Sequence, residues 1–199
     1  MVNTSHPVRI GVLGTHSTGK TTLLKRIEME LRAEGITVAR TGRLGKRAAA
    51  AGLPTMQHHT ATSTEWIIAQ GIADELAATG QGADVVLLDR AVHDAIAYFN
   101  AALEYRSEIP PRVERERLLT LASTQLPKYD LLFATVLDER QPVDTRHDYD
   151  PRFRRLVDQH THLLLNQNDI PHLKVTSDPD SQAHAIDTAL QRCLKEDLG

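Results

Sequence analysis

Short apolar runs alternate along the chain with longer stretches in which apolar residues recur every three or four positions. The short runs predict strands at residues 8–13, 37–40, 84–89, 129–136 and 172–175. The longer stretches predict helices at residues 19–34, 44–51, 62–78, 92–103, 111–126, 151–166 and 179–194. Because strands joined by helical crossovers pair in parallel, the pattern predicts an α/β, three-layer fold around a parallel five-stranded sheet.

Turn and capping residues support several of these boundaries. Gly35 follows the first predicted helix, and Pro111 and Pro151 suit the first turns of two later helices. Thr62 or Ser63 is expected to cap the helix that follows them. A length of 199 residues suits one predicted domain, residues 1–199.

A complete phosphate-binding loop follows the first predicted strand. The run Gly-Thr-His-Ser-Thr-Gly-Lys-Thr matches the P-loop pattern, and an amphipathic helix follows it as the motif requires. The two glycines let backbone N–H groups turn toward phosphates, the lysine reaches the outer phosphates, and Thr21, which follows the lysine, is placed to coordinate Mg2+. We therefore expect a nucleotide site formed by Gly14, Thr15, His16, Ser17, Thr18, Gly19, Lys20, Thr21 and Thr22.

A carboxylate and an arginine come directly after the third predicted strand. In a parallel sheet, the carboxyl ends of the strands line the ligand crevice, so Asp89 and Arg90 are expected to face the phosphates. Asp89 is predicted to hold Mg2+ with Thr21 or to act as a general base, and Arg90 to bind the acceptor or the transferred phosphoryl group. The alternative is an ordinary strand-end aspartate beside a solvated arginine.

Composition narrows the class of protein. A net charge of -3 provides no basic surface for nucleic acid or an anionic membrane, so neither is expected as a partner. Cys193 is the only cysteine, which excludes an internal disulfide and a multi-cysteine zinc site. The polar residues 1–7 lack a signal core and no apolar run has membrane-spanning length, so a cytoplasmic location is expected.

These motifs together resemble the small-molecule kinases of the P-loop fold. The residues that carry the likeness are the P-loop, Asp89-Arg90 followed by Asp94-Ala95-Ile96-Ala97-Tyr98, and an arginine-bearing segment before Pro151. More narrowly, the chain is similar to the AAA-type ATPase-like group that includes the ribosylnicotinamide kinase module of bacterial NAD regulators. The resemblance implies that Asp89, Arg90 and Asp94 lie at the acceptor site and that an arginine-rich lid closes over the nucleotide.

One departure from that group concerns the end of the second strand. Such kinases often carry an acidic residue with an arginine there, whereas this chain has Arg40-Thr41-Gly42-Arg43. Arg43 is the counterpart of the arginine, and its acidic partner is missing. The general base therefore stays open between Asp89 and Asp94.

The polar segment 138–150 is predicted to be a mobile lid, extending to about residue 155. Of its arginines we favour Arg146 for stabilising transferred charge, because it lies within the flexible stretch. Arg152, Arg154 and Arg155 are expected instead to form the solvated face of the following helix.

Other polar and aromatic residues are less specific. The histidine pairs His58-His59 and His160-Thr161-His162 lack the spacing of a zinc site, so structural or surface roles are expected. Trp66 and Gln70 are candidates for contacting the acceptor from one helix face, with a core role as the alternative for Trp66.

The sequence thus predicts phosphoryl transfer from ATP, with Mg2+, to a small acceptor such as a nucleoside or nucleotide-like molecule. No guanine-reading Asn-Lys-x-Asp motif follows the fourth predicted strand, which favours ATP over GTP. Two alternatives stay open: a regulatory P-loop ATPase acting through a protein partner, and a kinase of a sugar or aminoglycoside-type metabolite. A homodimer is also left open.

Overall fold

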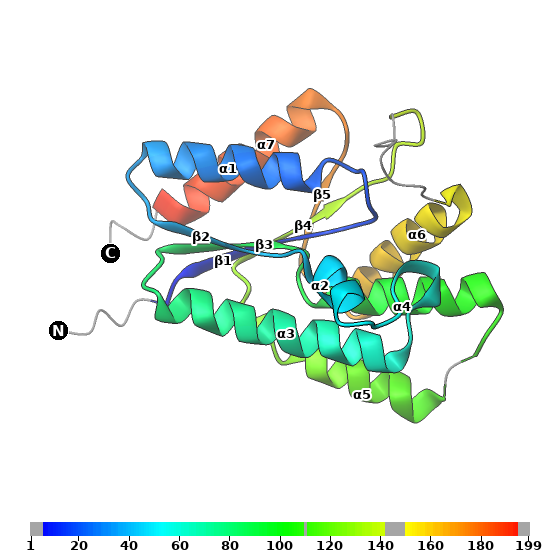
Figure 1. The fold of residues 1–199 in the computed structure, drawn as a ribbon. Helices are drawn as coiled ribbons and strands as arrows, with labels where there is room; N and C mark the ends of the chain where they lie inside the picture. The colour runs from blue at the N-terminus through cyan, green and yellow to red at the C-terminus, as the bar shows by residue number, and fades with distance from the viewer. Residues whose placement is uncertain (1–5, 110, 142–149, 195–199) are drawn as a thin grey trace.

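Five parallel strands form one sheet at the centre of the molecule. The computed structural model describes residues 6–109, 111–141 and 150–194. The strand order is β2-β3-β1-β4-β5, and every neighbouring pair is parallel (Figure 1). The predicted five-stranded parallel sheet is confirmed. Its strands are β1 (Val8–Leu13), β2 (Val38–Thr41), β3 (Val85–Asp89), β4 (Leu131–Thr135) and β5 (Leu173–Val175).

Helices cover both faces of this sheet, which gives the three predicted layers. Two helices, α1 (Lys20–Ala33) and α7 (Pro179–Leu194), lie together on one face (Figure 1). The opposite face carries α2 (Leu44–Ala50), α3 (Ala61–Gly80), α4 (His93–Arg106), α5 (Arg112–Ser123) and α6 (Pro151–Gln167). Two short 3-10 helices, η1 (Met56–His58) and η2 (Leu126–Lys128), lie in the connections.

Apolar side chains on both sides of each central strand explain the layers. In β3, Val85 and Leu87 pack with α1, whereas Val86 and Leu88 pack toward α3. Since both faces are covered, the strand is apolar at consecutive positions rather than at alternate ones. In β1, Val12 packs into the cluster of α1, and the next residue, Leu13, packs into a cluster with Leu165 of α6.

Two predicted boundaries need correction. Thr60, and neither Thr62 nor Ser63, is the N-cap of α3; its hydroxyl accepts from the Ser63 amide in a capping box. The fourth strand begins at Leu131, later than predicted, because η2 turns the chain just before it. The pattern of apolar residues indicated neither the capping box at Thr60 nor the 3-10 helix η2.

A buried polar network lies below β1. The Arg9 guanidinium is 3.6 Å from the Glu75 carboxylate of α3 and donates to the Thr79 hydroxyl at 2.9 Å. The Tyr129 hydroxyl donates to Glu75 Oε1 at 3.0 Å. Because Glu75 is 1% exposed, burial raises its pKa to about 7, against the opposing effects of the Tyr129 hydrogen bond and the Arg9 charge.

The strand order brings the ends of β1, β3 and β4 to one edge of the sheet. β1 lies between β3 and β4, so the loops that leave these strands meet where the direction of the connections reverses. Ligands of open α/β sheets bind in such a crevice. No helix within the described ranges is both long and apolar enough to cross a bilayer.

Candidate functional site

The loop between β1 and α1 has the backbone shape of a phosphate cradle. Gly14 has φ +134°, Ser17 +56° and Gly19 +82°, which turn successive peptide groups inward. A Cβ on Gly14 would come within 2.2 Å of the Thr135 hydroxyl oxygen, so this position requires glycine for space as well as for conformation. The loop therefore depends on β4 as well as on its own sequence.

Thr135, at the end of β4, braces the loop. Its hydroxyl donates to the Leu13 carbonyl at 3.1 Å and lies 2.6 Å from the Thr18 hydroxyl. Thr135 is almost fully buried. Nothing in the sequence singled it out, because its role depends on the pairing of β4 with β1.

Lys20 is held inside the loop. Its Nζ donates to the Thr15 carbonyl and to the Thr18 hydroxyl, the latter at 3.2 Å. Burial, together with the nearby positive charge of Arg90, lowers the pKa of Lys20 to about 7. An anion bound in the loop would provide the counter-charge that the buried lysine requires.

The predicted pair Thr21 and Asp89 is brought together across the first turn of α1. The Thr21 hydroxyl donates to Asp89 Oδ2 at 3.0 Å. An adjacent hydroxyl and carboxylate at the edge of a phosphate loop are hard oxygen ligands of the kind that Mg2+ prefers. The residues present therefore fit a magnesium ion.

Arg90 and Asp94 form a clamp that binds the two peptide groups on either side of Gly14, the first residue of the loop. Asp94 Oδ1 accepts from the Gly14 amide at 2.8 Å, and Arg90 Nη1 donates to the Gly14 carbonyl at 3.0 Å. The two side chains also form an ion pair with each other. Arg90 adopts φ +87° and lies over the Tyr98 ring, 4.7 Å from its centroid. Both residues thus lie at the loop, where they contact Gly14 and each other.

An aromatic and histidine cluster adjoins this clamp. The His16 Nδ1 lies 3.3 Å from the Tyr98 hydroxyl, and the His59 ring centroid is 5.8 Å from that of Tyr98. Phe153 of α6 meets Tyr98 edge to face. Burial lowers the pKa of His59 to about 4, so its ring is neutral at physiological pH. The buried His16 thus links the loop to this cluster.

The arginines of α6 differ from the prediction. Arg152 and Arg155 are exposed, but Arg154 is only 5% exposed, so its assignment to a solvated face is wrong. Its Nε and Nη2 have no hydrogen-bond partner within the described part of the chain. One turn later, burial raises the pKa of Asp158, and the charges of Lys20 and Arg154 oppose that rise. Arg154 and Asp158 are four residues apart, so they lie on the same face of α6. The favoured Arg146 lies outside the described residues.

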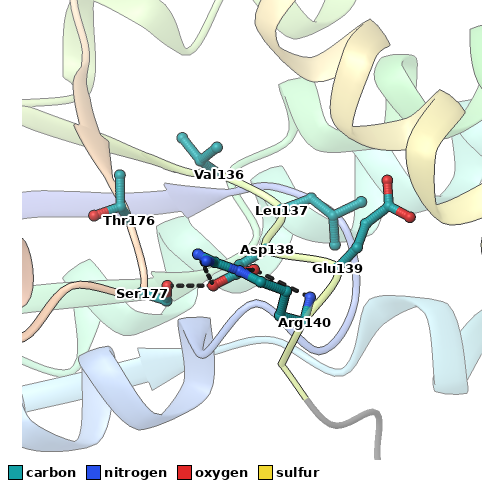
Figure 2. A pocket seen from close by; sticks show the side chains of 7 residues that line it. All are labelled: Val136, Leu137, Asp138, Glu139, Arg140, Thr176 and Ser177. Atoms are coloured by element: carbon teal, nitrogen blue, oxygen red, sulfur yellow. Dashed lines mark hydrogen bonds and ion pairs between the residues drawn. The ribbon is translucent and has the colours of Figure 1, made fainter.

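A pocket of about 470 Å³ opens where β4 and β5 end (Figure 2). Asp138 lies at its centre, accepting from the Ser177 hydroxyl at 2.8 Å and from Arg140 Nε at 3.0 Å. These hydrogen bonds, that of Arg140 foremost, hold the pKa of Asp138 well below its usual range. The other lining residues are Val136, Leu137, Glu139 and Thr176.

The remaining predicted acceptor residues lie in separate surroundings. Arg43 is exposed at the N-cap of α2. Trp66 packs against the apolar cluster between α3 and α4, which favours the core alternative for this residue. The Gln70 amide donates to Asp74 at 2.8 Å and belongs to a local network. Among the described residues, neither side chain forms a hydrogen bond with the loop between β1 and α1.

Comparison with known proteins supports the fold that these residues predict. The sequence profile of a family described as "AAA domain" matches residues 9–181. A crystal structure of NadR protein in complex with NAD and AMP-PNP superposes with a TM-score of 0.70 at 17% identity, covering 94% of this chain and 50% of that one. A NadR complex with NR gives 0.65 at 16% identity, with coverages of 94% and 51%. The chain thus spans about half the length of these structures. No curated protein matches it.

Proposed function

The chain belongs to the AAA domain family, and from this premise we propose that it is a P-loop kinase that transfers the γ-phosphoryl group of ATP to a small, nucleoside- or nucleotide-like acceptor. The observation that supports this most strongly is the contact between the Thr21 hydroxyl and Asp89, beside the buried Lys20. A loop, a lysine and a strand-end carboxylate in this relation are the parts that phosphoryl transfer requires.

The polyphosphate of ATP would bind in the loop between β1 and α1. Inward-turned N–H groups and the positive end of the α1 dipole attract it, and Lys20 supplies a charge at the outer phosphates. The pocket around Asp138 lies beside β4, the strand that pairs with β1. We assign this pocket to the nucleoside part of ATP.

Magnesium would be held by Thr21 and Asp89. When bound, the ion neutralises charge on the β- and γ-phosphates and orients them. Asp94 is unsuited to the role of general base, because its two oxygens are already engaged by Gly14 and Arg90. Of the two carboxylates, Asp89 is the one that faces the reacting groups in this proposal.

Charge on the transferred group would be stabilised by Lys20 and by Arg154. Both are buried, and Arg154 keeps N–H groups free of hydrogen-bond partners among the described residues. A guanidinium suits this task because its fixed N–H groups match phosphoryl oxygens. The acceptor would enter beside Tyr98, His16 and His59, next to the loop.

The test is an ADP-release assay with ATP and Mg2+ across nucleosides, nucleoside monophosphates, sugars and aminoglycosides, with mass analysis of each product. A product heavier by one phosphoryl group is expected from a nucleoside-like acceptor. Lys20→Ala should abolish transfer, and Asp89→Asn should lower kcat far more than ATP affinity. Hydrolysis that no acceptor stimulates, or unchanged turnover in Lys20→Ala, would refute the kinase assignment.

A further inference from the structure

An arginine lies beside the carboxylate that we assign to the metal ion. Arg40, in β2, places Nη2 3.8 Å from Asp89 Oδ2, the oxygen that also accepts from the Thr21 hydroxyl. Its Nη1 lies 3.3 Å from Glu28 Oε2 on α1. One guanidinium therefore lies between a strand-end carboxylate and a helix carboxylate.

The surroundings keep Asp89 within reach of Arg40. Gly42 follows two residues after Arg40 with φ +153°, and a Cβ there would lie 2.9 Å from the Asp89 Cβ. The Asp89 side chain is thus packed on the backbone at the end of β2. A larger residue at position 42 would displace the carboxylate, so Gly42 allows Asp89 to stay close to Arg40.

Glu28 is shared between two arginines. Its Oε1 accepts from Arg32 Nε at 3.0 Å, and its Oε2 is the oxygen near Arg40. Arg32 also donates to the Val38 carbonyl and has no contact with Asp89 among the interactions of the described residues. The two arginines therefore share one acidic partner but differ in their relation to the metal site.

The position of Arg40 has an electrostatic consequence for cations. A bare divalent ion at Thr21 and Asp89 would be repelled by the guanidinium, because like charges a few ångströms apart repel strongly even at the effective permittivity of a protein surface. A metal ion carried by a nucleotide arrives in a complex of net negative charge. The same guanidinium attracts that complex.

We propose that Arg40 is a resident positive charge at the metal site that makes the site selective for metal already bound to nucleotide. Without metal it neutralises Asp89; when the metal–nucleotide complex binds, it turns toward Glu28. Arg40 is a positioning residue in this scheme. The inference rests on the proposed function for the assignment of Thr21 and Asp89 to the metal.

The test measures Mn2+ binding to the full chain by electron paramagnetic resonance, first without nucleotide and then with ADP. Arg40→Gln should bind free Mn2+ roughly tenfold more tightly, whereas its affinity for Mn2+–ADP should stay equal or fall. Glu28→Gln should bind free Mn2+ more weakly, because Arg40 is left with Asp89 alone. Arg26→Gln, which changes an exposed arginine of α1, is the matched control and should leave both affinities unchanged, and Asp89→Asn should remove the binding.

Unchanged or weaker binding of free Mn2+ by Arg40→Gln would overturn the proposal, as would equal gains with and without ADP. Glu28→Gln is expected to change the affinity for free Mn2+ in the opposite direction, so the test stays decisive if one of the two variants is unstable. These measurements need no acceptor and no turnover. If Arg40→Gln and Glu28→Gln change the affinity for free Mn2+ in opposite directions but the protein phosphorylates no acceptor, only the kinase assignment is refuted. If the protein phosphorylates an acceptor but these changes in affinity are absent, only this inference is refuted.

Discussion

The Asp94 carboxylate accepts a hydrogen bond from the Gly14 amide at 2.8 Å, joining the start of α4 to the first residue of the phosphate loop. Eighty positions separate the two residues in the chain. The loop is thus fixed from outside, by a carboxylate whose charge Arg90 balances.

Removing this clamp should weaken nucleotide binding. In Asp94→Ala the Gly14 N–H loses its buried acceptor, and a buried unsatisfied donor costs about 1–3 kcal/mol, so affinity for an ATP analogue should fall about tenfold or more. Asp94→Asn keeps an acceptor oxygen, so its affinity should lie between that of the unchanged protein and that of Asp94→Ala. Isothermal titration calorimetry measures both, with the exposed Asp187→Ala as control. Affinity retained in Asp94→Ala would show that the clamp is dispensable.

The protein should take up a proton when it binds nucleotide near neutral pH. The pKa of Lys20 is lowered to about 7 in the free protein, chiefly by burial, and phosphates restore the charged form. Because the bound state holds more protons, affinity should decrease as pH rises above about 7. Calorimetry at pH 8 in buffers of different ionisation enthalpy reports the uptake. Lys20→Gln should lack it, and equal uptake in that variant would assign the proton elsewhere.

Arg154→Met should impair turnover while sparing the fold, since methionine retains much of the apolar stem. Loss of one preorganised donor to the transferred group costs roughly 100- to 1000-fold in kcat, with a smaller change in KM for ATP. Arg155→Met is the control, because that side chain is exposed on the same helix. Equal effects of the two substitutions on kcat would remove Arg154 from the site.

Stability should depend on pH through Glu75. Burial raises its pKa from 4.5 to about 7 in the folded chain, so between these values the folded state holds more protons than the unfolded state. The free energy of unfolding contributed by this group therefore decreases as pH rises through that window, by up to roughly 3 kcal/mol. Glu75→Gln keeps an oxygen for Tyr129 and removes the titration. Urea unfolding from pH 4.5 to 8 should give a flatter profile for Glu75→Gln, and parallel profiles would contradict this account.

Residues close together in sequence were predictable, and those joined by packing were not. The loop from Gly14 to Thr21 has a fixed spacing, because consecutive peptides form it, and Asp89 follows from the rule that strand ends line the crevice. Thr135 acts on Gly14 from a distant strand, so no local pattern indicates it. The resemblance indicated Asp94 as an acceptor-site residue, but not its hydrogen bond with the Gly14 amide. Arg154 was misassigned because the sequence placed it on the correct helix without showing which face the helix buries.

The central place of β1 also determines when the loop can form. The strand that carries the loop is made first, but its partners β3 and β4 end at Asp89 and Thr135, far along the chain. Contacts of such long sequence separation form slowly. During synthesis on the ribosome, the loop therefore lacks its brace until Thr135 is made, and a nascent chain that stops before β4 carries the whole P-loop sequence without the strand that supports it.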